Sequence, residues 1–495
     1  MKRSSYAALP ERFFAQIAPT PVAAPRLLTF NQALAEELRL DCGGLGAEAL
    51  AGRYSGNVVP PELTPIAMAY AGHQFGHFVP QLGDGRAILL GESVDRAGRR
   101  RDIQLKGSGR TPYSRGGDGR AALGPVLREY LVSEAMHALG IPTTRSLAAV
   151  ATGEPVFRDG GALPGAILTR VAASLVRVGT FQYFAARNDV DGVRRLADYV
   201  VERHYPQAAG NERPYLALLR AVIRAQASLI ASWMQVGFIH GVMNTDNMAV
   251  SGETIDFGPC AFMDSYDSAA VFSSIDHHGR YAYGNQPHAG AWNLARFAET
   301  LLPVIDPQLD RAVELATEEV AAFSARFAEA YLTGWRRKLG LSAPEDGDAA
   351  LAADLLEAMQ RDQADFTLTF RRLCDAAEST DTAAADAAAP LCSLFANPQD
   401  CAAWTQRWRA RLGREPVGME PAARAAAMRR VNPAFIPRNH RIEAVINAAI
   451  DGQDFSLFEE MSAVLARPYL EQPEFAPYAD PPQPGEKVLA TFCGT

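Results

Sequence analysis

Cysteine is scarce in this chain, which has six cysteines in 495 residues: Cys42, Cys260, Cys374, Cys392, Cys401 and Cys493. No two of them form a Cys-x-x-Cys pair, so the sequence gives no sign of a disulfide framework or of a zinc site. Few and scattered cysteines fit a reducing compartment best. We therefore expect a cytoplasmic protein.

Long hydrophobic runs and an excess of positive charge are also missing. No stretch approaches the ~20 apolar residues that a membrane-spanning helix needs, and the first residues lack the apolar core of a secretory signal. The formal net charge is −8 and the pI is about 5.7, which argues against a protein that coats nucleic acid. We expect neither a membrane nor a nucleic acid as a partner.

The charge reverses sign locally. Residues 81–130 carry ten Lys and Arg against six Asp and Glu, a net +4 inside an acidic chain. A polyphosphate site would need such a charge, and a solvated basic face is the alternative explanation.

The most specific motif lies at residues 240–258. His240 and Asn247 are seven residues apart, and Asp256-Phe257-Gly258 follows. Protein kinases have a catalytic loop His-x-Asp-x4-Asn followed by Asp-Phe-Gly, in which the Asn and the second Asp hold metal ions. Val242 stands where the kinase base would be, and Asp246 is the nearest carboxylate. The sequence predicts binding of metal-ATP with a chemistry that differs from that of an ordinary kinase.

The chain is long enough for two kinase lobes and one or two further domain equivalents of about 100–200 residues each. Glycine-rich turns between apolar runs over 80–106 predict hairpin strands. Apolar spacing with glycine and proline stops predicts helices; their ranges are 27–40, 125–139, 215–236, 312–332 and 353–373. The Ala-, Asp- and Thr-rich segment 375–389 is too poor in large apolar residues to build a core, and we expect an exposed linker there.

Lys106 and Glu129 are candidates for an ion pair between a strand and a helix. In kinases such a carboxylate orients the lysine that binds the phosphates. Glu129 lies about 200° round the helix from Leu127, so it can face the site while the leucines pack. An ordinary surface pair is the alternative.

Glycines and arginines around this pair are candidate phosphate contacts, because glycine lets backbone N–H groups approach closely and arginine binds phosphate with two hydrogen bonds. A hairpin turn and solvated arginines are the alternatives. The Gly- and Arg-rich insertion 107–120 could fold over the phosphates. The candidates are Gly83, Gly85, Arg86, Asp118, Gly119, Arg170 and Arg177.

Six long motifs give the chain a resemblance to the selenoprotein O family, the pseudokinase-like protein adenylyltransferases. They are Gln-Leu-Gly-Asp-Gly-Arg (81–86), Leu-Lys-Gly-Ser-Gly-Arg-Thr-Pro-Tyr-Ser-Arg (105–115), Gly-Asp-Gly-Arg (117–120), Ser-Glu-Ala-Met-His-Ala-Leu-Gly-Ile-Pro-Thr-Thr-Arg (133–145), His-Gly-Val-Met-Asn-Thr-Asp-Asn-Met (240–248) and Asn-Pro-Ala-Phe-Ile-Pro-Arg-Asn-His (432–440). One small departure is Phe257, where relatives often have Tyr.

The resemblance implies an α+β, protein-kinase-like bilobal fold with terminal extensions. The expected units are an N-terminal extension (1–60), an N-lobe with the Gly/Arg-rich insertion (61–170), a C-lobe (171–310) and a helical C-terminal extension (311–495). It also implies that ATP binds inverted relative to a kinase. AMP, and with UTP also UMP, would pass to Ser, Thr or Tyr hydroxyls of proteins, including the enzyme itself, with a role in redox or stress response.

The roles that the resemblance implies fall on particular residues. Lys106 and Glu129 form the ion pair, and Asp246 is the base. Asn247 and Asp256 hold Mg²⁺ or Mn²⁺. The nucleotide-binding residues are Gly83, Gly85, Arg86, Lys106, Glu129, Asp118, Gly119, Arg170, Arg177 and Asp256.

Eukaryotic members of the family carry selenocysteine third from the C-terminus, and Cys493 holds that place here. We hypothesise a redox disulfide from Cys493 to Cys260, which follows the Asp-Phe-Gly. Cys260 could instead be a small buried apolar residue.

Two other functions stay open at this point. A kinase that transfers the γ-phosphate would share Lys106, Asn247 and Asp256, but Val242 and the Arg-rich insertion count against it. A catalytically inactive ATP-binding scaffold would not need a complete metal pair.

Overall fold

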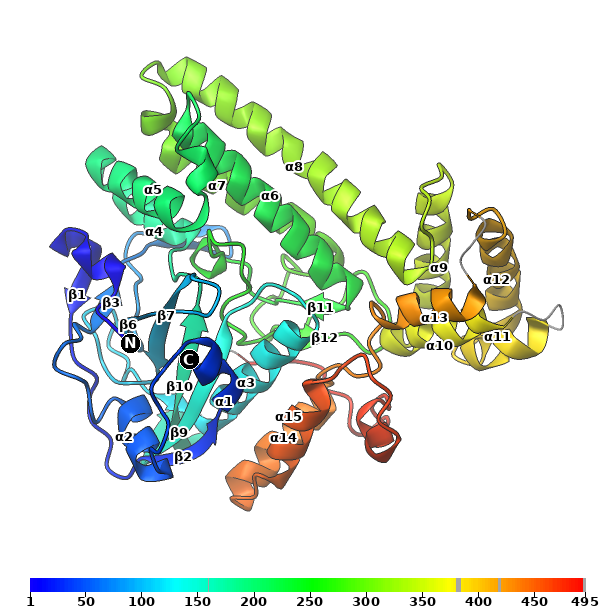
Figure 1. The fold of residues 1–495 in the computed structure, drawn as a ribbon, viewed down its shortest axis with the longest axis horizontal. Coiled ribbons are helices and arrows are strands. Elements are labelled where there is room, and N and C mark those ends of the chain that lie inside the picture. Colours follow the sequence, from blue (N-terminus) through cyan, green and yellow to red (C-terminus); the bar gives the residue numbers. More distant parts are fainter. Residues whose placement is uncertain (159, 380–383, 417–419, 493–495) are drawn as a thin grey trace.

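A mixed α/β fold is built around one antiparallel sheet in the computed structural model, which describes residues 1–158, 160–379, 384–416 and 420–492 (Figure 1). The strand order is β1-β3-β6-β7-β10-β9-β2, and β8 pairs with β10. The strands are β1 (Phe14–Gln16), β2 (Arg26–Phe30), β3 (Ile66–Met68), β6 (Ala87–Val94), β7 (Arg100–Lys106), β8 (Ala121–Ala122), β9 (Arg145–Arg158) and β10 (Gly161–Ala172). The strands expected over 80–106 are confirmed as β6 and β7.

Both faces of the sheet are covered. Successive side chains of a strand point to opposite faces, so Ala149 packs into the main core while Val150 packs into a second, smaller core. The main core includes α3 (Leu123–Ala138), the helix expected over 125–139. The second core includes α1 (Gln32–Glu37) and α2 (Ala47–Ser55).

The helix expected over 27–40 is wrong in its first half. Residues 26–30 form β2, which pairs with β9, and the helix begins only at Gln32. Asn31 separates the two elements, because its side-chain oxygen accepts a hydrogen bond from the backbone N–H of Leu34 at 3.0 Å and so caps α1.

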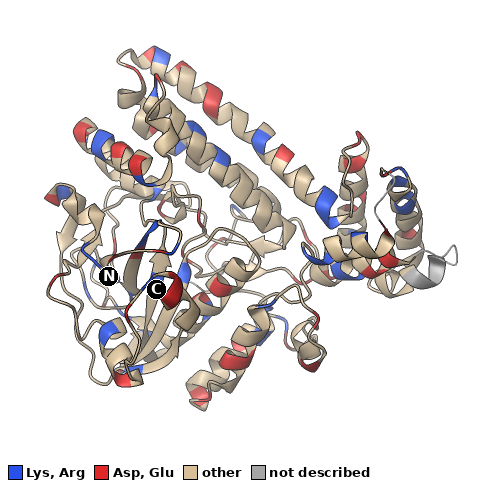
Figure 2. Cartoon of the chain, viewed as in Figure 1, with Lys and Arg blue, Asp and Glu red and all other residues tan. Residues whose placement is uncertain are grey.

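A set of helices packs beyond the sheet: α4 (Val178–Ala185), α5 (Val190–His204), α6 (Pro214–Gln235), α7 (Gln286–Ile305) and α8 (Leu309–Lys338). α6 and α8 confirm the helices expected over 215–236 and 312–332. By length and composition α6 could cross a membrane, and 61% of its most apolar window is buried inside the structure. Along α8, acidic and basic residues are interspersed, and Arg336, Arg337 and Lys338 occupy its last turn (Figure 2).

The remaining helices form the C-terminal part: α9 (Asp348–Asp362), α10 (Phe366–Glu378), α11 (Ala384–Cys392), α12 (Pro398–Leu412), α13 (Pro421–Arg429), α14 (Asn439–Asp451) and α15 (Ser456–Leu465). The single helix expected over 353–373 is wrong. Gln363 adopts a left-handed φ of 53° and ends α9, and Asp365 caps α10 through the N–H of Leu368 at 2.8 Å. The linker expected over 375–389 is wrong where the structure describes it, because α10 and α11 enter it; residues 380–383 lie outside the described residues.

Cysteine use differs from the expectation in one place. Cys392 and Cys401 form a disulfide, with Cα atoms 5.4 Å apart, where the sequence had given no sign of one. A spacing of nine residues does not by itself indicate a disulfide. The two cysteines meet because one lies at the end of α11 and the other in the first turn of α12. Cys260 is fully buried, and burial raises the pKa of its thiol to about 11. Cys493 lies outside the described residues, so its pairing with Cys260 stays a hypothesis.

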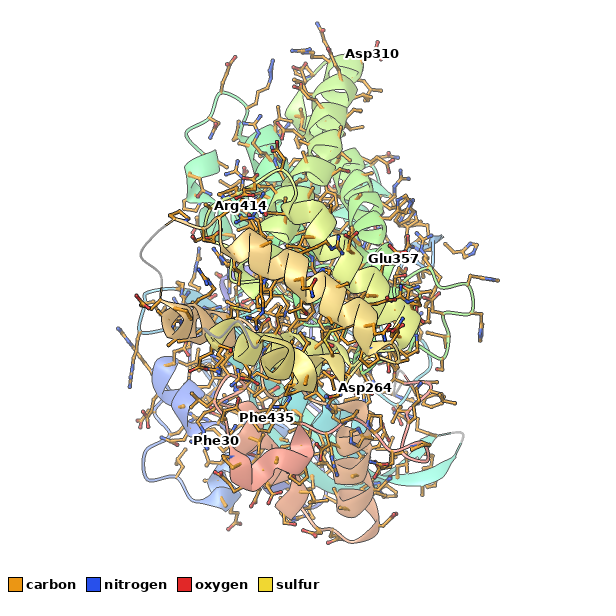
Figure 3. All side chains as sticks on the ribbon, turned by 90° about the vertical axis from the view of Figure 1, so that its right-hand side faces the viewer. Phe30, Asp264, Asp310, Glu357, Arg414 and Phe435 are labelled. Atoms are coloured by element: carbon orange, nitrogen blue, oxygen red, sulfur yellow. A yellow bond between two sulfur atoms is a disulfide. The ribbon has the colours of Figure 1, made fainter. Side chains whose placement is uncertain are left out.

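The segment that follows Asp256-Phe257-Gly258 is fixed by distant parts of the chain. Arg438, which is 1% exposed, donates to Asp264 at 2.6 Å and to Asp365 at 2.9 Å. Figure 3 views this side of the molecule, with Glu357 on α9, Arg414 just after the end of α12, and Asp264 labelled below them. Nearer the C-terminus, the hydroxyl of Thr491 donates to the Pro259 carbonyl at 2.6 Å.

The short elements complete the fold. Two hairpins are formed by β4 (Gly72–Gln74) with β5 (His77–Val79) and by β11 (Phe238–Ile239) with β12 (Ala261–Phe262). Turns of 3-10 helix occupy Ser5–Ala8, Glu11–Phe13, Pro206–Ala208, Thr245–Asn247, Tyr283–Asn285 and Pro473–Tyr478.

We expect Arg438→Met to lower the free energy of unfolding by about 3–5 kcal/mol, because it strands two largely buried carboxylates. The matched control is Arg407→Met, which removes an ion pair to Asp354 whose side chains are 58% and 40% exposed; it should cost less than about 1 kcal/mol. Urea denaturation measures both values. Equal losses would mean that the Arg438 cluster does not hold the C-terminal helices to the body of the protein.

Candidate active site

A cavity of about 450 Å³ lies between the sheet and the loop 240–247. With one exception, every residue predicted to be catalytic, nucleotide-binding or metal-binding lines this cavity. The exception is Glu129, which lies behind Lys106 and binds it. The lining residues from the predicted set are Gly83, Gly85, Arg86, Lys106, Asp118, Gly119, Arg170, Arg177, Asp246, Asn247 and Asp256.

A cluster of buried charges forms the inner wall of the cavity. Lys106 Nζ, at the end of β7, donates to Glu129 Oε2 at 2.6 Å and to Asp256 Oδ1 at 2.9 Å. Arg170 Nη2, on β10, binds Glu129 Oε1 and Asp256 Oδ1, both at 2.5 Å. Antiparallel pairing places Arg170 opposite Gln104, two residues from Lys106, so that the two cations share one face of the sheet.

Arg177 completes the cluster from the start of α4. Its Nη1 donates to Asp256 Oδ2 at 2.5 Å and to the Asp246 carbonyl at 2.6 Å, and its guanidinium lies 4.8 Å from the centre of the Tyr70 ring. Burial disfavours the charged form of Asp256, but Arg170, Lys106 and Arg177 outweigh it and hold the pKa of Asp256 well below its usual value. Three cations therefore face two carboxylates, and the wall keeps one net positive charge.

The loop 240–247 carries the candidate metal ligands. Its conformation is set by His240, whose Nε2 lies 2.9 Å from the Ile255 carbonyl. Asn247 donates its Nδ2 to the Val242 carbonyl at 3.0 Å, which leaves its Oδ1 to coordinate. Asp256 has a left-handed φ of 65°, a strained conformation of the kind found at functional sites.

These oxygen donors fit a magnesium ion. Magnesium is usually held by one or two carboxylates together with substrate phosphates, and it keeps several waters. Among the described residues no group of three or more His, Cys, Asp or Glu side chains could form a cage of protein ligands. The pair Asn247 and Asp256 therefore fits an ion that enters together with a polyphosphate.

Asp246 is a buried carboxylate beside this pair, and only 7% of it is exposed. Gln74 Nε2 donates to its Oδ2 at 3.2 Å, and its Oδ1 has no hydrogen-bond partner among the described residues. Burial raises the pKa of Asp246 to about 6 although Arg177 lowers it. A carboxylate with a raised pKa is a better proton acceptor than an ordinary one.

The Gly83–Gly85 turn is braced by the insertion 107–120. The Thr111 hydroxyl donates to the Asp84 carbonyl at 2.6 Å, and the Ser114 hydroxyl donates to the Gly85 carbonyl. The buried Asp84 side chain accepts from the backbone N–H of Met68 and from Gln104, each at 3.1 Å. The insertion therefore forms a wall of the cavity, as expected.

Asp118 and Gly119 lie on the rim. The Asp118 side chain is 42% exposed and pairs with Arg158 at 2.8 Å. Gly119 has a φ of +68°, and a Cβ there would lie 2.1 Å from the Gly109 carbonyl oxygen. Only glycine fits this position, where two parts of the insertion touch.

Sequence reasoning missed several lining residues, namely Tyr70, Gln74, Phe75, Tyr113 and Arg158. Residues 66–79 form strands of only three residues, too short for an alternating pattern to be recognised. The run His73-Gln74-Phe75-Gly76 was the available signal, since polar residues beside a glycine interrupt an apolar segment there.

Comparison with known proteins was made over the whole chain. A family model described as protein adenylyltransferase SelO matches residues 2–466. The chain is 65% identical over 492 residues to a protein nucleotidyltransferase YdiU of Rhizobium rhizogenes, covering 99% of this chain and 96% of the relative. A YdiU protein of a Bradyrhizobium species is 65% identical over 497 residues, covering 100% and 99%. That of Rhizobium meliloti is 62% identical over 493 residues, covering 99% of each.

We expect Gly119→Ala to weaken ATP binding at least tenfold, about 1.4 kcal/mol, because the added Cβ pushes the insertion off the cavity wall. Gly116→Ala is the matched control: Gly116 also has a positive φ, +84°, but no atom lies within 4 Å of its Cβ position. Both variants carry a similar backbone penalty, so the difference in Kd, measured by calorimetry, reports the clash. Equal Kd values would show that the contact at Gly119 does not shape the site.

Proposed function

This chain belongs to the SelO family of protein adenylyltransferases, and we propose that its cavity transfers AMP from ATP to Ser, Thr or Tyr hydroxyls of proteins, the enzyme itself included. UTP is a possible second donor, with transfer of UMP. The observation that carries the proposal is the position of the carboxylates. Val242 occupies the place of a kinase base, while Asp246 lies in the cavity beside Asn247.

The proposed roles follow from the geometry. Phosphoryl-type transfer depends mainly on charge neutralisation and positioning. Lys106, Arg170 and Arg177 supply positive charge at the inner wall, and Glu129 holds the first two in place. Arg86 and the backbone of Gly83, Gly85 and Gly119 would contact the nucleotide from the outer wall, and Asp118 from the rim.

The metal would be held by Asn247 and Asp256 and would neutralise charge on the triphosphate when bound; we propose magnesium or manganese. Arg170 and Arg177, which lie against Asp256, would face the phosphate oxygens from the inner wall.

The proposed chemical step is a displacement at the α-phosphorus. The hydroxyl oxygen of the acceptor forms a bond to the α-phosphorus, and the bond from that phosphorus to the bridging oxygen of the β-phosphate breaks. Pyrophosphate leaves with the bonding electrons, and Asp246 takes the proton of the hydroxyl. The buried carboxylate, with its pKa raised to about 6, is suited to this role.

We propose the same architecture as expected from the sequence: a kinase-like bilobal body of residues 61–170 and 171–310, an N-terminal extension of residues 1–60 and a helical extension of residues 311–495. In this proposal the central strands of the sheet, with α3 across them, make up the first lobe, and α4 to α7 the second. The N-terminal extension contributes the two edge strands, β1 and β2. A cytoplasmic location and a role in redox or stress response complete the proposal.

Incubation with ATP labelled at either the α- or the γ-phosphate should transfer only the α-label to protein. Purified enzyme, alone and mixed with cell lysate, is resolved by electrophoresis, and intact mass should rise by one AMP per modified site. Transfer of the γ-label alone would establish a kinase, and transfer of neither label would favour a binding scaffold.

Asp256→Ala should abolish transfer, because it removes a metal ligand and leaves three cations without their shared partner. Asp246→Ala should lower turnover by ~10²–10⁴-fold while the Kd for ATP stays nearly unchanged. Asp191→Ala, which removes a carboxylate that is 56% exposed on the surface, is the control and should match the wild type. Loss of ATP binding in Asp246→Ala, with no separate effect on turnover, would make Asp246 a metal ligand instead of the base.

A further inference from the structure

The hairpin β4–β5 (residues 72–79) is a small element of its own, a two-stranded sheet apart from the main one. It packs against α4 and the loop 240–247, and its residues Gln74 and Phe75 line the cavity. Neither the motifs nor the proposed roles above give it a function.

Three consecutive residues of the hairpin bind three consecutive residues of the loop. The backbone N–H of His73 donates to the Thr245 hydroxyl at 2.7 Å. The Gln74 side chain donates to Asp246 Oδ2 at 3.2 Å.

The third contact joins the backbone N–H of Phe75 to Asn244 Oδ1 at 3.0 Å. A second layer supports these contacts, since the Thr245 hydroxyl donates to Gln182 Oε1 at 2.6 Å while Gln182 Nε2 lies 2.8 Å from His73 Nδ1.

The tip of the hairpin is strained. Phe75 has a φ of +51°, which is rare for a bulky residue and costs about 1–3 kcal/mol. The Phe75 ring lies 5.2 Å from that of Tyr281, whose hydroxyl donates to the same Asn244 oxygen at 2.7 Å. The surrounding structure therefore holds the backbone of Phe75 in a strained conformation. Because Gln74 is the preceding residue, this conformation also fixes Gln74 beside Asp246.

The hairpin also sets the position of the other carboxylate oxygen. A Cβ on Gly72 would lie 2.6 Å from Asp246 Oδ1, so the bare glycine lets the carboxylate pack directly against the hairpin backbone. Arg177 reaches only the backbone carbonyl of Asp246. The Gln74 side chain, by contrast, donates a hydrogen bond to the carboxylate itself.

We propose that Gln74 is a positioning residue, which fixes the orientation of the Asp246 carboxylate. Oδ1 is buried against Gly72, so Oδ2, the oxygen that Gln74 binds, would accept the proton of the attacking hydroxyl. This inference rests on the proposed function, in which Asp246 is the base. One hydrogen bond fixes the rotation of a carboxylate about its Cβ–Cγ bond, and a proton acceptor must lie within hydrogen-bond reach of the hydroxyl in the correct orientation.

The experiment is a double-mutant cycle of Gln74→Leu and Asp246→Ala, with kcat and the KM for ATP measured for α-label transfer. Gln74→Leu keeps much of the side-chain volume and loses the donor. It should lower kcat by about 10- to 100-fold, a part of what a whole base contributes, and leave the KM for ATP within twofold. In the Asp246→Ala background the same substitution should change kcat less than twofold, because residues that act through one another are not additive.

Two further variants complete the experiment. Gln74→Glu keeps the shape of the side chain but replaces the donor with a carboxylate next to Asp246, and its kcat should fall at least as far as that of Gln74→Leu. His77→Ala, on the exposed strand of the same hairpin, should keep wild-type kcat. Thermal melting of all variants shows whether the fold is intact.

The possible contrary results are distinct. An equal fall in kcat from Gln74→Leu in both backgrounds, or a rise in KM with kcat unchanged, would overturn the positioning role and make Gln74 an independent structural or substrate contact. Unchanged kcat in both Gln74 variants would overturn it outright. Unchanged kcat in Asp246→Ala would instead overturn the base assignment of the proposed function, and this inference with it.

Discussion

The carboxylate of Asp256 is the point on which the interior of the site depends. Lys106 from β7, Arg170 from β10 and Arg177 from the start of α4 all donate to it, at 2.5 to 2.9 Å. Groups from the sheet and from the helical part therefore meet at one residue. Such a cluster is costly to bury and is stable only when its charges are matched closely. The cluster has one positive charge in excess, and this charge favours the binding of an anion such as a triphosphate.

Two independent supports hold the loop 240–247 and the segment that follows Asp256. The hairpin β4–β5 binds residues 244–246 of the loop. Arg438 and Thr491 fix the segment after Asp256, so its conformation rests on parts of the chain that are distant in sequence. Electrostatic catalysis works best when the charged groups need no rearrangement during the reaction. In a site that is built in this way, the charged groups are already arranged when the protein has folded.

The sequence predicted the residues of the cavity well, because most of them belong to local motifs. In such motifs the residue types and their spacing along one loop or strand already indicate the chemistry. Lys106 and Glu129 could be paired from the phase of one helix. Arg170 and Arg177 were placed by the resemblance and by their spacing, and the structure brings both onto Asp256. The helix limits of α3, α6 and α8 followed from periodicity and from glycine and proline stops.

The features that sequence reasoning missed depend on tertiary contacts. Gln74 gains its significance only because the hairpin folds against a loop about 170 residues later. Residues 27–30 were expected to begin a helix, but they form a strand that pairs with β9, a tertiary contact that the local sequence does not reveal. The Cys392–Cys401 disulfide depends on how the end of α11 meets the start of α12, which spacing alone does not reveal. Gln363 ends α9 in a left-handed conformation, which sequence reasoning expects at a glycine and not at a glutamine.

The bond from Thr491 to Pro259 spans 232 residues of sequence. A ribosome that has just made Pro259 must therefore add almost half of the protein before Pro259 meets this partner. Until then Pro259 and its neighbours lack the support that the finished fold gives them. During synthesis there is thus a long interval in which the residues that line the cavity have all been made, but the contact that supports the segment after Asp256 has not yet formed.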